Sequence, residues 1–142
     1  MDIEDLVYQI TCKQPNFEVV ERVLGGSPDL ISGIIWENAS VLHLAARNDV
    51  LNGTQLVQWL VENYKADVNF SNDGGSVPLL WALAAMHEAI EMGKDYYVHS
   101  IEWMVRCAGI KMKKVLINRG ELKEFIKEFF ECDEIWRIVE RV

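Results

Sequence analysis

Positive charge is scarce in this chain. Its 142 residues include 14 Lys and Arg against 22 Asp and Glu, which gives a formal net charge of −8. Clustered Lys and Arg side chains drive binding to the phosphate backbone of nucleic acids, and anionic membrane surfaces attract basic patches in the same way. The composition therefore argues against both partners. The short basic stretch K-M-K-K at 111–114 is interpreted as a solvated loop or helix end.

Long apolar runs are absent, and cysteines are few. No apolar stretch approaches the ~20 residues that a membrane-spanning helix needs, and the opening M-D-I-E-D is acidic where a secretory signal would be basic. The three cysteines, Cys12, Cys107 and Cys132, are odd in number and far apart. This pattern is typical of reduced thiols rather than of a disulfide framework. We therefore expect an intracellular, reducing location, the cytoplasm, with the nucleus left open.

Motifs for catalysis, phosphate binding and metal binding are missing as well. His87 and Glu88 do not begin an H-E-x-x-H motif, because Glu91 stands where the second histidine is needed. The G-G-S segment at 25–27 lacks the Lys and the spacing of a phosphate loop, and no C-x-x-C pair marks a structural zinc site. We expect no enzyme activity, no cofactor and no metal. Catalytic groups that meet only in the folded chain stay open as an alternative.

What the chain does have is a high share of hydrophobic residues, 50%, arranged at helical spacing. The segment S-V-L-H-L-A at 40–45 recurs loosely as V-P-L-L-W-A at 77–82, an offset of 37 residues. Each apolar stripe ends at a glycine or another small residue, as helices commonly do. The periodicity predicts helix pairs at 3–12 and 16–24, 40–48 and 54–64, and 78–92 and 96–107, followed by helices at 121–131 and 133–142.

The segments S-V-L-H-L-A-A at 40–46 and A-D-V-N at 66–69 resemble an ankyrin repeat, whose first helix opens T-P-L-H-x-A-A and whose second helix leads into G-A-D-V-N. The resemblance implies an all-α solenoid of stacked antiparallel helix pairs with short hairpin-like fingers. It divides a single domain, 1–142, into repeats at about 1–35, 36–69 and 70–111, with C-terminal capping helices at about 112–142. Residues 49–52 are interpreted as an insertion between two helices, and Lys65 occupies the place of a left-handed glycine.

The resemblance also implies structural and functional roles. His43 is expected to bridge the backbone of adjacent loops. The fingers are expected at 34–38 and 70–76, with the turn N-D-G-G at 72–75 holding Asn72 and Asp73 exposed at its tip. The implied function is non-catalytic binding of a protein partner, one with a basic patch, through the fingers and the concave inner-helix face. The positions that carry this binding are Trp36, Leu44, Arg47, Asn48, Asn72, Asp73, Trp81 and Ala85.

Two other functions fit the same sequence. The amphipathic segment 121–142 would allow the chain to dimerise as a structural module rather than cap the stack. An all-helical enzyme or ligand-binding domain would resemble an ankyrin repeat by chance, and would show a deep pocket with converging titratable groups.

Overall fold

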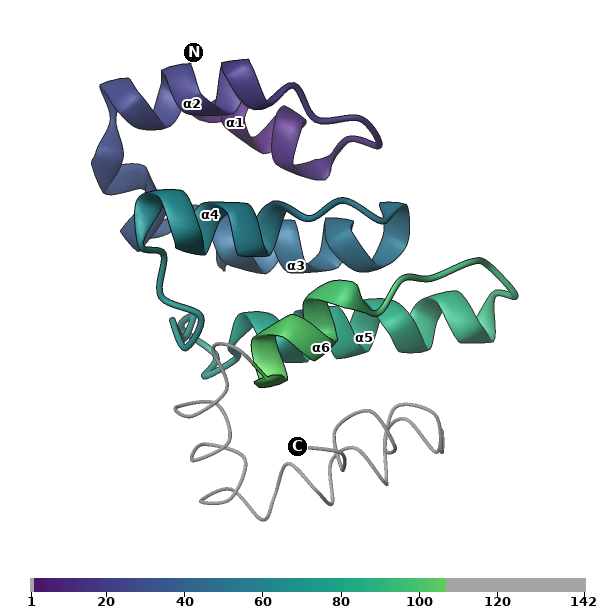
Figure 1. Cartoon of the computed structure of the whole chain (residues 1–142). Coiled ribbons are helices and arrows are strands. Elements are labelled where there is room, and N and C mark those ends of the chain that lie inside the picture. The colour runs from purple at the N-terminus through teal and green to yellow at the C-terminus, as the bar shows by residue number, and fades with distance from the viewer. Residues whose placement is uncertain (1, 107–142) are drawn as a thin grey trace.

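The computed structural model describes residues 2–106 of the chain (Figure 1). The predicted helices at 121–131 and 133–142, and the cap or dimer contact assigned to them, lie outside these residues. The described elements in chain order are α1 Asp2–Thr11, α2 Phe17–Gly26, the 3₁₀ turn η1 Pro28–Ser32, β1 Ile34–Trp36, β2 Ala39–Ser40, α3 Val41–Asn52, α4 Leu56–Tyr64, α5 Pro78–Glu91 and α6 His99–Arg106.

Among the described residues the six α-helices form three pairs, α1 with α2, α3 with α4, and α5 with α6. The pairs lie in successive layers (Figure 1), in which α2, α4 and α6 are nearer the viewer than their partners. We call α1, α3 and α5 the inner helices and α2, α4 and α6 the outer helices. The inner helices contact one another in sequence, and α4 contacts α6. The expectation of a mostly helical chain is confirmed, and the strands of the part that the structure describes form one short hairpin.

Helix α3 lies at the centre of the hydrophobic core. It contacts α1 and α5 on its two sides and also α4 and α6. Between Val41 and Val50 every residue except Arg47 is buried. Ala45 and Ala46 have no exposed surface, so their small side chains allow the adjacent helices to approach closely.

The end of α3 corrects one expectation. Residues 49–52 are not an insertion between helices, because α3 continues to Asn52 and stops where Gly53 takes a left-handed conformation, φ 71°. Asp49 remains helical and directs its carboxylate to the start of α4, where it accepts hydrogen bonds from the backbone N–H groups of Leu56 and Val57 at 2.9 and 3.0 Å. Helix α4 therefore begins at Leu56, capped by a side chain from α3. The left-handed position of Lys65, φ 54°, is confirmed at the end of α4.

Helix α6 begins later than expected, at His99 rather than at residue 96. The backbone N–H of Tyr97 donates to the carbonyl of Val50 at 2.9 Å, and its ring lies against Gly53. Residues 94–98 are not helical, and Tyr97 within them is bonded to α3.

Candidate partner-binding face

The first finger is a tight hairpin. Strands β1 and β2 are antiparallel and are joined by Glu37 and Asn38, whose φ angles are 40° and 60°. Two consecutive left-handed residues between paired strands are typical of a type I′ turn, which matches the twist of the strands. Glu37 and the preceding Trp36 are both exposed, and Trp36 retains 47% of its surface. The hairpin therefore holds an aromatic ring and a carboxylate at its tip.

The second finger, residues 70–76, is organised by the side-chain amide of Asn72. Its Oδ1 accepts hydrogen bonds from the backbone N–H groups of Gly74 and Ser76, both at 2.9 Å. Its Nδ2 donates to the carbonyl of Asn38 in the first finger at 3.1 Å. Asn72 is consequently only 9% exposed, and the expectation that it stands exposed at the tip is wrong. The side-chain amide that favours this turn forms the hydrogen bonds of the turn, and it is therefore buried.

The two fingers are joined a second time through Asp73. The backbone N–H of Asp73 donates to Oδ1 of Asn38 at 3.1 Å, while Asp73 itself is exposed, as expected. Asn38, which follows Glu37, is thus hydrogen-bonded to both Asn72 and Asp73. These bonds link the two tips that carry the exposed residues Glu37 and Asp73.

His43 connects helix α3 to the second finger through hydrogen bonds. Its Nε2 lies 2.8 Å from the carbonyl oxygen of Ser76, and its Nδ1 lies 3.3 Å from the backbone nitrogen of Ser40. A carbonyl accepts only, so Nε2 carries the proton and Nδ1 accepts from Ser40. Burial lowers the pKa of His43 below its ordinary 6.5, and the bond to Ser76 opposes this shift. The expected structural bridge is confirmed, with His43 in its neutral form.

The inner helices expose fewer of the expected positions than the fingers do. Trp81 is half-buried, with its ring 5.2 Å from that of His43 in an edge-on arrangement. Arg47 is also half-buried, and its Nη1 lies 3.0 Å from the Glu88 carboxylate. Both remain accessible in part.

Three other expected positions are buried: Leu44, Asn48 and Ala85. Their assignment to an exposed face is wrong, because these side chains are enclosed within the packed helices. Asn48 has a structural role, since its Nδ2 donates to the carbonyl of Cys12 at 2.8 Å and ties the second layer to the first.

The structure also exposes residues that the sequence did not single out. Ile34 of β1 is exposed, and Tyr8 on α1 retains 66% of its surface. The first helix lacks the T-P-L-H signature, but its buried Leu6 and Ile10 give the helical register from which Tyr8 follows.

Within residues 2–106 no three His, Cys, Asp or Glu side chains come together as a candidate metal site. No helix in that same stretch has the length and apolar character required to cross a bilayer.

Residues 37–73 match the family model of the ankyrin repeat. The matched segment runs from the tip of the first finger, through α3 and α4, to the tip of the second finger. The resemblance inferred from the two short motifs is confirmed over these residues, where one ankyrin repeat is matched. No curated protein and no solved structure matches the chain.

Proposed function

We propose that this chain is a non-catalytic binding module, an ankyrin-repeat solenoid that recognises a protein partner through its fingers and the exposed part of its inner helices. Ankyrin repeats generally mediate protein–protein interaction. The observation that supports this use of the face is the pair of joined fingers, which presents Trp36 beside Glu37 and Asp73. Aromatic residues at the centre of an interface commonly supply much of its affinity.

Rigidity of the fingers supports the same proposal. The left-handed turn at Glu37 and Asn38 is fixed by its own hairpin, and Asn38 is bonded to both Asn72 and Asp73. His43 holds the base of the second finger through Ser76. A surface that is ordered before binding loses little conformational entropy on association, so a modest contact area gives useful affinity.

The charge of the fingers points to a basic patch on the partner. Residues 33–40 and 70–77 contain Glu37 and Asp73 but no Lys or Arg, and Arg47 on the neighbouring inner helix is already paired with Glu88. Complementary charge accelerates encounter and makes the on-rate depend on salt. We place this interaction in the cytoplasm, where the cysteines would remain reduced.

A charge-reversal comparison tests the proposal. The partner is first recovered from lysate by crosslinking to the full chain. Glu37→Lys and Asp73→Lys are then compared with Glu18→Lys, a reversal of an exposed glutamate on outer helix α2, with folding checked by circular dichroism. We expect the two finger variants to weaken binding about tenfold or more and the α2 variant to leave it nearly unchanged. Loss of binding confined to Glu18→Lys would show that the partner uses the outer helices instead.

A further inference from the structure

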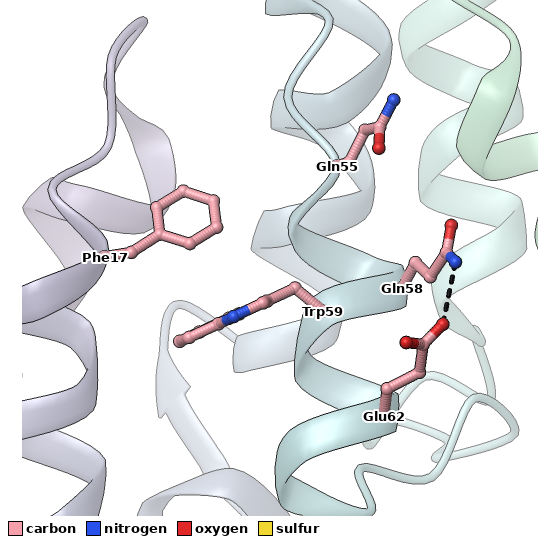
Figure 2. A pocket seen from close by; sticks show the side chains of 5 residues that line it. All are labelled: Phe17, Gln55, Gln58, Trp59 and Glu62. Atoms are coloured by element: carbon pink, nitrogen blue, oxygen red, sulfur yellow. Dashed lines mark hydrogen bonds between the residues drawn. The ribbon is translucent and has the colours of Figure 1, made fainter.

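The outer side of the molecule carries a groove between the first and second layers (Figure 2). It is open to solvent and has a volume of about 240 Å³. Four of its lining residues come from α4 and the turn before it, at the i, i+3, i+4 and i+7 spacing that places side chains on one helix face. Phe17, at the start of α2, completes the lining. The residues concerned are Phe17, Gln55, Gln58, Trp59 and Glu62.

The indole ring of Trp59 is held by two neighbouring rings. Phe17 lies at a centroid distance of 4.8 Å on the α2 side, and Tyr64 lies at 5.4 Å further along α4. Figure 2 shows the Trp59 side chain extending from α4 toward Phe17. The ring is half-buried rather than enclosed, so a fixed aromatic surface lines the groove.

Glu62 gives the groove a negative charge. Its Oε1 accepts a hydrogen bond from Nε2 of Gln58 at 2.7 Å, and Oε1 of Gln58 lies 2.9 Å from Nε2 of His99. The carboxylate is thereby positioned, but within residues 2–106 no ion pair joins it to a Lys or Arg, including the exposed Arg22 of α2. Glu21 adds negative charge on the same side. Burial is the main cause that raises the pKa of Tyr64, and the charge of Glu21 raises it further.

We propose that this groove binds an arginine or lysine side chain of a protein, whose positive charge is attracted by the ring of Trp59 and by the carboxylate of Glu62. The groove is lined by the half-buried ring of Trp59 and by the carboxylate of Glu62, which forms no ion pair within residues 2–106, and both groups attract the positive charge of such a side chain. The site is on the outer helices and is therefore separate from the finger surface.

The test uses N-acetyl-arginine amide and its neutral isostere N-acetyl-citrulline amide as probes. Each is titrated into the full chain while the indole N–H signals are followed by NMR, with the Trp59 signal assigned from Trp59→Phe. We expect a saturable shift of the Trp59 signal with the arginine probe and little shift with citrulline. Glu62→Gln should weaken the arginine probe about three- to tenfold, because the hydrogen bond from Gln58 can persist while the charge is lost. Glu4→Gln, a change at an exposed glutamate of α1, is the matched control and should leave binding unchanged.

Equal shifts with arginine and citrulline, an undiminished affinity in Glu62→Gln, or a response confined to the other indoles would each overturn the proposal. The result is independent of the finger proposal, because Trp36 gives its own signal.

Discussion

The carboxylate of Asp49 accepts a hydrogen bond at 2.5 Å from the hydroxyl of Ser100, a residue 51 positions further along the chain. The same carboxylate accepts from Thr54 and from the two backbone N–H groups that open α4. One buried side chain, 2% exposed, thus joins α3, α4 and α6. Burial raises the pKa of Asp49, and the hydrogen bonds oppose the shift by stabilising the charged form.

Replacement of Asp49 should therefore destabilise the fold strongly. Asp49→Ala removes the cap of α4 and leaves the hydroxyls of Thr54 and Ser100 without this acceptor, for an expected loss of about 2–4 kcal/mol in the free energy of unfolding. Urea denaturation followed by circular dichroism measures it. Asp73→Ala, which removes an exposed carboxylate, should change stability by less than about 0.5 kcal/mol. Equal effects of the two variants would contradict the capping role.

The neutral state of His43 predicts a dependence of stability on pH. Because burial lowers its pKa in the folded chain, the unfolded chain binds more protons between that lowered pKa and 6.5. The free energy of unfolding should therefore fall as the pH drops below about 6.5, by at most ~1.4 kcal/mol per pH unit. Above about pH 6.5, His43 is neutral in both the folded and the unfolded chain, so this loss of stability is absent.

His43→Gln isolates this effect. Both proteins keep His87, His99 and Asp49, so the difference between their stabilities reports the titration of His43 alone. We expect the two curves of unfolding free energy against pH to converge as the pH is lowered from 7.5 to 5. Parallel curves over that range would show that His43 has the same pKa in the folded and unfolded chains.

The tight packing of α3 predicts a penalty for added volume. Ala45 is fully buried between helices, whereas Ala84 on α5 is exposed. Ala45→Leu should lower stability by about 1–3 kcal/mol through overpacking, while Ala84→Leu should be nearly neutral. Thermal melts of both variants compare the same substitution at a buried and an exposed site, and a shared melting temperature would disprove the assigned core.

Local pattern predicted the parts of the fold that local interactions determine. The helical periodicity placed six helices in the described region to within a few residues. The resemblance to the ankyrin repeat gave His43 its expected role as a bridge to the backbone of adjacent loops, and its bond to Ser76 confirms that role. The Asp49 network could not be predicted in this way, because Ser100 is 51 positions away and nothing in the sequence links the two.

The candidate face was predicted less well for a similar reason. Leu44, Asn48 and Ala85 were assigned from their place in the repeat, but their exposure depends on how closely α1, α3 and α5 pack, which is a property of the assembled layers. Trp36 and Asp73 are exposed as expected, whereas Asn72 beside Asp73 is buried, because its side-chain amide is hydrogen-bonded within and between the fingers. Whether these residues bind a partner remains the proposal that the charge reversals test.

The side chain of Asn72 makes a final prediction about the second finger. Asn72→Ala removes the acceptor for the N–H groups of Gly74 and Ser76 and the donor to Asn38. Amide hydrogen exchange at Gly74 and Ser76 should then accelerate about tenfold or more, because their partners are replaced by water. Asn72→Asp retains an acceptor oxygen for the two N–H groups but replaces the donor to the Asn38 carbonyl with a carboxylate oxygen, so exchange at these two positions should stay close to that of the parent while the bond to Asn38 is lost. Equal acceleration in both variants would show that the tie to the first finger, rather than the Asn72 oxygen, orders the turn.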